Sequence, residues 1–299
     1  MHALRRGACQ YGFTLVELVL VVALSAVVVV MVSTVLSRPL EGFVAQSRRA
    51  DLVDIGSIAL NRMQRDIRMA VPGSLRPSPD NQGLELLLIN NVGRYRPNRI
   101  SSTDGKELKF SAVPNADCLG PLDTDSGQNR CDVLQVLSPG WQPPSAGWLV
   151  AAIWNEQLSW VEGSSGQILP WRAFTPLQDD VAFPGISLIA LEIAPSSSEL
   201  TFDKFPAGMR LYFADRVVGY RCQDGKLLRY EKTGGLHDSL SNGLPAGVSA
   251  HVQAGQISGC SFQIDSEASQ ASQATLRLNI AQAGEAIRLV QFVKVNNAP

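Results

Sequence analysis

An apolar run near the N-terminus constrains this chain more than any other feature of its sequence. The run extends from Phe13 to Leu36, 24 residues in which Glu17 is the only charged side chain. A helix rises about 1.5 Å per residue, so the run spans roughly 36 Å, enough to cross the hydrocarbon core of a bilayer. A carboxylate inside such a run is costly in lipid, which predicts a partner for Glu17. Arg5 and Arg6 precede the run and indicate that this side stays in the cytoplasm.

The order of leader and apolar run differs from that of a secretory signal, in which the cleavage site follows the apolar core. Here Gly12 is the candidate cleavage point and precedes the run. The apolar segment would therefore remain as the new N-terminus after processing of the leader, residues 1–12. The alternative is an uncleaved membrane anchor in which Glu17 lies near the membrane interface.

The sequence Gly-Phe-Thr-Leu-Val-Glu-Leu at residues 12–18 resembles the type IV prepilin signature of pilins, minor pilins and type II secretion pseudopilins. The resemblance implies that a prepilin peptidase cleaves after Gly12 and methylates the new terminal amine on Phe13. It also implies that Glu17 pairs with the N-terminal amine of a neighbouring subunit during assembly. Two charges in lipid each cost several kcal/mol unless they meet, so this pairing is physically reasonable. The implied partners are the peptidase, other major and minor pilin subunits, and the inner-membrane assembly platform.

Charge and motifs argue against a nucleic-acid partner and against catalysis. The net charge is −1, and removal of Arg5 and Arg6 would leave 24 basic and 27 acidic residues, or −3. A nucleic-acid-binding surface is usually basic. The sequence lacks the common metalloprotease, hydrolase, phosphate-binding and dinucleotide-binding motifs. Two histidines follow the leader, His237 and His251, and neither lies in a catalytic motif. We expect no enzymatic activity and no cofactor.

Four cysteines follow the leader: Cys118, Cys131, Cys222 and Cys260. An even number in a translocated domain predicts two disulfides, with three possible pairings, of which we favour the pairs nearest in sequence. A metal site is the alternative, but the chain has no Cys-x-x-Cys and no cluster of histidines. Asp123 and Asp125, in an Asp/Ser/Gly/Asn segment between the first two cysteines, form a weak candidate for calcium.

The chain after the apolar run predicts a second helical segment and then strands. Pro39 predicts a kink or break near Leu36–Pro39. Apolar residues then recur at three- and four-residue steps over residues 37–71, with a charged face between them that we interpret as solvated. Pro72 and Gly73 end this pattern. The apolar stripe comprises Leu40, Phe43, Val44, Leu52, Ile55, Ile58, Ala59, Met63, Ile67 and Ala70.

Residues 72–299 alternate short apolar runs with turn residues, which predicts an antiparallel β-rich domain. Asp224-Gly225 is the clearest hairpin signal, and Gln282–Glu285 is a second. The fold class is therefore α+β, a long N-terminal helix packed on a β-rich domain, which resembles the pilin architecture. The strands are expected at Leu84–Ile89, Glu107–Val113, Val133–Leu137, Trp148–Trp154, Leu158–Val161, Ile186–Ile193, Met209–Ala214, Val217–Cys222, Leu227–Glu231, Cys260–Ile264, Leu276–Ala281 and Ile287–Val295.

Dispersed segments resemble minor pilins of the mannose-sensitive haemagglutinin (MSHA) pilus, the MshO group. They include residues 38–76, Leu84–Arg96, the Gly219–Tyr230 hairpin and the ending at residues 293–299. The resemblance implies a minor pilin that waits in the inner membrane with its β domain in the periplasm, enters a type IV pilus and helps to start its assembly. The alternatives are a type II secretion minor pseudopilin and a tip adhesin.

All five tryptophans lie within residues 141–171. Clustered tryptophan with proline and glycine is compatible with an adhesin's binding surface. Trp148 and Trp154 lie in an apolar run and are expected in the core, whereas Trp141 is the best candidate for an exposed contact.

Overall fold

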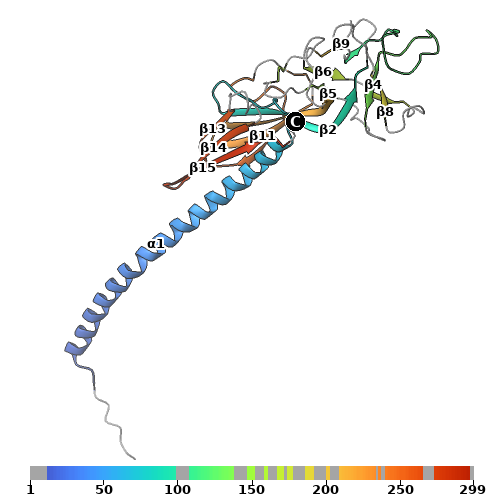
Figure 1. Ribbon diagram of the computed structural model, residues 1–299. Helices are drawn as coiled ribbons and strands as arrows, with labels where there is room; N and C mark the ends of the chain where they lie inside the picture. The colour runs from blue at the N-terminus through green and yellow to red at the C-terminus, as the bar shows by residue number, and fades with distance from the viewer. Residues whose placement is uncertain are drawn as a thin grey trace, which may run out of the picture. The chain divides into compact units, whose positions relative to one another are not determined.

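The computed structural model describes residues 12–98, 108–137, 147–151, 158–160, 167–171, 174–177, 186–191, 200–202, 209–233, 235–236, 240–264 and 273–296. The chain divides into two compact units, Met1–Asp51 and Leu52–Pro299. The ribbon is shown in Figure 1.

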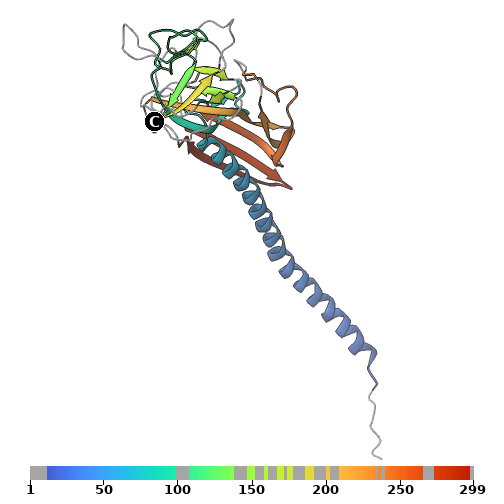
Figure 2. The same cartoon turned by 90° about the vertical axis from the view of Figure 1, so that its right-hand side faces the viewer.

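One helix, α1, runs from Leu15 to Arg68, 54 residues, and passes through Pro39 without interruption (Figures 1 and 2). Of the two alternatives predicted near Leu36–Pro39, the break is therefore wrong, and the kink stays a prediction. A proline removes one helical hydrogen bond and crowds one carbonyl. The helix has more than 20 residues on each side of Pro39, and a helix of this length can continue past the loss of one hydrogen bond.

In its described residues, the second unit contains the end of α1 and three antiparallel sheets. The path of the largest sheet is β12-β11-β10-β2-β4-β8-β7, with β1 paired to β2, and with β5 paired to β10 and β6. A second sheet has the order β13-β14-β15, and β3 pairs with β9. The strand bounds are β1 Arg76–Pro77, β2 Gly83–Arg96, β3 Lys109–Phe110, β4 Val133–Val136, β5 Gly147–Val150, β6 Ile168–Trp171, β7 Phe174–Pro176, β8 Ser187–Leu191, β9 Leu200–Thr201, β10 Arg210–Gln223, β11 Lys226–Lys232, β12 Ala250–Ala254, β13 Ile257–Ile264, β14 Gln273–Gln282 and β15 Glu285–Lys294. The α+β class with a β-rich globular domain is confirmed.

Both predicted hairpins are present. Asp224 and Gly225 have φ angles of 50° and 70°, and Ala283 and Gly284 have 48° and 85°. Positive φ at both central residues is the requirement of the two-residue hairpin turn that matches strand twist.

Some strands differ from the expectation. The structure has one strand, β10, where two were expected at Met209–Ala214 and Val217–Cys222. Its pairing with β2 is irregular at Phe213–Arg216. This bulge lets the strand continue where the alternation of apolar and polar residues breaks. Residues Leu158–Trp160 are not a strand.

Two hydrophobic cores flank the long strands β2 and β10. The first packs the end of α1 on β2, β10 and the β13–β15 sheet, and its buried side chains include Leu52, Met63, Ile67, Leu84, Tyr220, Phe262, Leu278 and Ile280. The second core lies among β2, β4, β5, β6, β8 and β10, and includes Trp148, Trp160, Ile189, Tyr212 and Phe213. Figure 2 shows the β13–β15 strands, in orange to red, beside the end of α1.

The predicted apolar stripe of α1 is buried only in part. Leu52, Ala59, Met63, Ile67 and Ala70 are buried, as expected. Ile58 and Phe43 were expected in the stripe, but their side chains are 68% and 72% exposed. Three- and four-residue steps drift around a straight helix, so a long stripe cannot keep every member on one face.

Candidate functional site: the N-terminal helix and its anchor in the β domain

The first turn of α1 begins at a side-chain cap. The backbone N–H of Glu17 donates to Thr14 Oγ1 at 3.3 Å, and the N–H of Leu18 donates to the Thr14 carbonyl at 3.2 Å. Thr14 is thus the N-cap residue, and Glu17 stands at the third helical position, the spacing of a capping box. This role of Thr14 was not predicted from the sequence, although Thr-x-x-Glu before an apolar run is the usual signal of a capping box.

The segment that follows, Leu15–Val35, is long and apolar enough to cross a membrane, with 21 residues and a mean hydropathy of 3.0. Its side chains are exposed on every side of the helix, and Phe13 just before it is 78% exposed. An apolar surface that surrounds a helix is stable only in lipid or against other apolar helices. The segment therefore fits a single membrane anchor, and Glu17 is the only charged residue within it.

Gly12 lies just before the first turn of α1. Among the described residues, no atom lies within 4 Å of the position that a Cβ would take there, so their packing gives no reason for glycine at residue 12.

The comparisons with known proteins agree with this geometry. The family described as "Prokaryotic N-terminal methylation motif" matches residues 7–33. The comparisons with curated proteins and with solved structures find no match. The motif supports a type IV pilin or pseudopilin, and it implies processing by a prepilin peptidase and association with pilus subunits in general.

At its other end, α1 is anchored to the β domain by a buried acid. Arg229 Nε of β11 donates to Asp66 Oδ2 at 2.8 Å, and the Tyr220 hydroxyl of β10 donates to the same oxygen at 2.7 Å. Asp66 and Arg229 are buried, and Tyr220 is completely so. Burial and the nearby Asp66 carboxylate raise the pKa of Tyr220 above its usual range, so that its hydroxyl remains a donor.

Asp66 corrects the expectation of a fully solvated charged face on α1. The exposed charged residues in this part of the helix are Asp51, Asp54, Arg62, Arg65 and Arg68, as expected, but Asp66 faces the sheet. Asp66 lies next to Ile67, which belongs to the apolar stripe. The order of charged residues along the sequence does not show that Asp66 is buried while its charged neighbours are exposed. Arg62 Nε approaches Asp66 Oδ1 at 3.9 Å and adds a weaker, outer contact.

A second buried acid, Glu85 of β2, holds the strands beneath the helix. Arg76 Nη2 lies 2.6 Å from Glu85 Oε2, and the Tyr230 hydroxyl donates to Glu85 Oε1 at 2.6 Å. The Arg76 guanidinium also lies 3.7 Å from the centroid of the Trp160 ring. A cation above a tryptophan face is attracted by the ring, so Arg76 links Glu85 of β2 to Trp160 of the second core.

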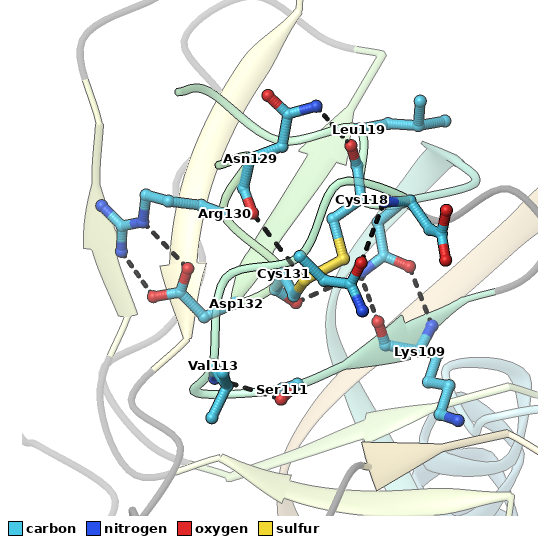
Figure 3. The surroundings of a disulfide bond; sticks show 12 residues. Lys109, Ser111, Val113, Cys118, Leu119, Asn129, Arg130, Cys131 and Asp132 are labelled. Atoms are coloured by element: carbon cyan, nitrogen blue, oxygen red, sulfur yellow. Dashed lines mark hydrogen bonds and ion pairs between the residues drawn. A yellow bond between two sulfur atoms is a disulfide. The ribbon is translucent and has the colours of Figure 1, made fainter. Parts of the chain in front are cut away.

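The two disulfides join the pairs favoured from the sequence, Cys118 with Cys131 and Cys222 with Cys260. The second disulfide links β10 to β13 and so ties the three-stranded sheet to the largest sheet. The first closes the loop shown in Figure 3, where Asn129 Nδ2 donates to the Cys118 carbonyl at 2.7 Å and Arg130 forms a two-pronged ion pair with Asp132.

The calcium candidate lies in a hydrogen-bonded turn within this loop. The Asp123 carboxylate accepts from the backbone N–H and the hydroxyl of Ser126, at 3.0 and 2.6 Å, and these bonds lower the pKa of Asp123. Asp125 is exposed. Among the described residues no group of three His, Cys, Asp or Glu is placed to hold a metal ion.

The structure describes the remaining candidates unevenly. The side chains of Trp148 and Trp160 are buried, and His251 lies exposed on β12. Trp141, Trp154 and His237, together with the leader up to Tyr11, lie outside the described residues.

Proposed function

We propose that the chain is a minor subunit of a type IV pilus of the MSHA kind, which enters the filament through its N-terminal helix and helps to start assembly. Before assembly it would be a single-pass inner-membrane protein with its β domain in the periplasm. Afterwards it would lie in a surface pilus. The proposal includes no catalytic activity and no cofactor.

One observation carries the proposal: a single carboxylate, Glu17, lies in the first turn of a helix whose apolar side chains are exposed on every side over Leu15–Val35. Such a surface has no partner among the residues that the structure describes, and it needs lipid or other apolar helices. Cleavage after Gly12 would create an amine at Phe13, the cation that could neutralise a neighbour's Glu17. An unpaired buried charge costs several kcal/mol, so the pairing would favour the assembled state.

Three substitutions in filament-producing cells test this role. Glu17→Ala removes the charge and the side chain, whereas Glu17→Gln keeps a residue suited to the capping box and removes only the charge. Thr34→Ala is the matched control, because it removes a polar group from the same segment without changing its charge. Mass spectrometry reports cleavage and methylation at Phe13, and sheared filaments report incorporation.

We expect the leader to be cleaved and Phe13 to be methylated in all three variants. Both Glu17 variants should be incorporated about tenfold less, which corresponds to ~1.4 kcal/mol. Thr34→Ala should be incorporated as well as the unchanged chain. Full incorporation of Glu17→Gln would assign Glu17 to the helix cap alone and refute the charge pairing. A chain that is never cleaved after Gly12 would overturn the proposed function.

The type II secretion pseudopilin shares the N-terminal chemistry and differs in its assembly partners. Deletion of the chain separates the two. Loss of surface pili with normal exoprotein release supports the pilus subunit, and the reverse result supports the pseudopilin.

A further inference from the structure

Strand β15 is an open edge of the β domain. It is the last strand of the β13-β14-β15 sheet, and no strand pairs with its other side within the described residues (Figure 1). It has ten residues, Glu285–Lys294. The opposite margin of this sheet is occupied, because the Phe262 N–H of β13 donates to the Asn81 carbonyl at 2.8 Å.

The hairpin turn determines which backbone groups of β15 are free. Ala283 and Gly284 form a two-residue turn, so the flanking residues Gln282 and Glu285 are a hydrogen-bonded pair. Hydrogen-bonded and non-hydrogen-bonded pairs alternate along an antiparallel ladder. Every second residue of β15 therefore directs its N–H and C=O away from β14, namely Ala286, Arg288, Val290, Phe292 and Lys294.

The same five residues carry the exposed side chains of the strand. Val290 is 47% and Phe292 67% exposed, so free backbone groups and apolar side chains occur at the same positions. Arg288 and Lys294 flank them, and Arg288 Nε donates to Asn279 Oδ1 at 3.0 Å, which directs the guanidinium across the sheet. Glu285, beside the turn, is the only acidic residue in the three strands.

We propose that the edge of β15 from Ala286 to Lys294 binds an extended segment of a different filament subunit, which adds to the sheet as a fourth strand. The inference rests on the proposed function of the chain as a filament subunit. A row of free N–H and C=O groups is satisfied in full only by another extended main chain. The apolar side chains select a segment with apolar residues at alternate positions. The positive charges of Arg288 and Lys294 favour a segment that also carries carboxylates.

A second copy of this chain offers the edge little acidic complement, because Glu285 is the only acidic residue of β15. In the antiparallel register with Val290 opposite Phe292, Arg288 of each copy would also lie opposite Lys294 of the other. Like charges directly opposite one another destabilise a strand pair. Open edges in soluble domains are commonly short or interrupted by proline or inward-facing charge. The edge strand β12 has five residues, whereas β15 has ten and no proline.

The test places a photo-crosslinking amino acid at residue 292 of the full chain in filament-producing cells. A second probe at Val252 is the control. Val252 is 56% exposed and lies on β12, the edge strand of the largest sheet, so this probe reports crosslinking at an edge other than β15. Two further substitutions are combined with the probe at residue 292. Val290→Pro removes one outward N–H without removing a bond to β14, and Arg288→Glu reverses the charge. Lys226→Glu is the control for charge, since Lys226 is exposed on β11.

We expect the probe at residue 292 to crosslink an acidic, alternating segment of another pilin-type subunit, identified by mass spectrometry, and the probe at residue 252 not to do so. Val290→Pro and Arg288→Glu should each reduce the crosslink at least about fivefold, and Lys226→Glu should leave it unchanged. No crosslink, a crosslink to a second copy or to lipid, or a crosslink that survives Val290→Pro would overturn the inference. Retained disulfides on a non-reducing gel report that each variant is folded. Cleavage and methylation at Phe13, measured in the same cells, report separately on the proposed function.

Discussion

The buried contact between α1 and the sheet gives the most demanding test of the fold. Replacement of Asp66 by alanine leaves the Arg229 guanidinium and the Tyr220 hydroxyl without their shared acceptor. Removal of one partner from a buried ion pair costs about 3–5 kcal/mol. Arg229 retains Glu231 at 2.7 Å, on a more exposed side chain, which reduces this cost. We therefore expect Asp66→Ala to lower the free energy of unfolding by about 3 kcal/mol.

The assay is urea unfolding of the full chain in non-ionic detergent, followed by tryptophan fluorescence. All five tryptophans belong to the β domain, so the signal reports on that unit. Asp54→Ala is the matched control, an exposed acid on the same helix, and should change the free energy by less than about 0.5 kcal/mol. The double variant Asp66→Leu/Arg229→Met should recover most of the loss, because it leaves no unpaired buried charge. A loss below about 1 kcal/mol for Asp66→Ala would refute the anchoring role.

Three other predictions concern the β domain. Replacement of Cys222 and Cys260 by serine should cost about 4 kcal/mol, from the chain entropy of a loop with a sequence separation of 38, and the same detergent assay measures it. Gly219→Ala should destabilise the fold strongly and reduce its yield, because the added Cβ would lie 2.0 Å from the Tyr230 ring. Hydrogen bonds from Arg221 hold the pKa of Asp80 below its ordinary value, so this contribution to stability is present above about pH 4 and is lost as the pH falls toward the folded-state pKa. Asp80→Asn should therefore flatten the decline of stability in acid, as followed by unfolding midpoints at stepwise lower pH.

Local patterns in the sequence predicted the features that depend on local chemistry. The apolar run and the two hairpins follow from residue types a few positions apart, and the structure contains them. The disulfide pairs join the cysteines nearest in sequence, at separations of 13 and 38. The N-cap at Thr14 belongs to the same class and was visible in the sequence.

The features that depend on tertiary contacts were not predictable in the same way. Asp66 is buried because Arg229 and Tyr220, more than 150 residues away, meet it there, and nothing in its own helix indicates this. Strand β10 continues through its bulge because β2 and β5 both pair with it. The edge of β15 becomes a candidate site only when the order of the sheet is known.

The single helix α1 performs two physical tasks in succession along its length. Over Leu15–Val35 every side chain is exposed in the described part of the chain, so substitutions there are expected to leave the folding of the β domain unchanged. From Leu52 onward Met63, Ile67 and their neighbours are completely buried, so substitutions there act on folding. Assembly and folding are therefore expected to be separable by mutation: Glu17 can be changed in a chain whose domain stays folded. This separation allows the charge of Glu17 to be tested without the ambiguity of an unfolded subunit.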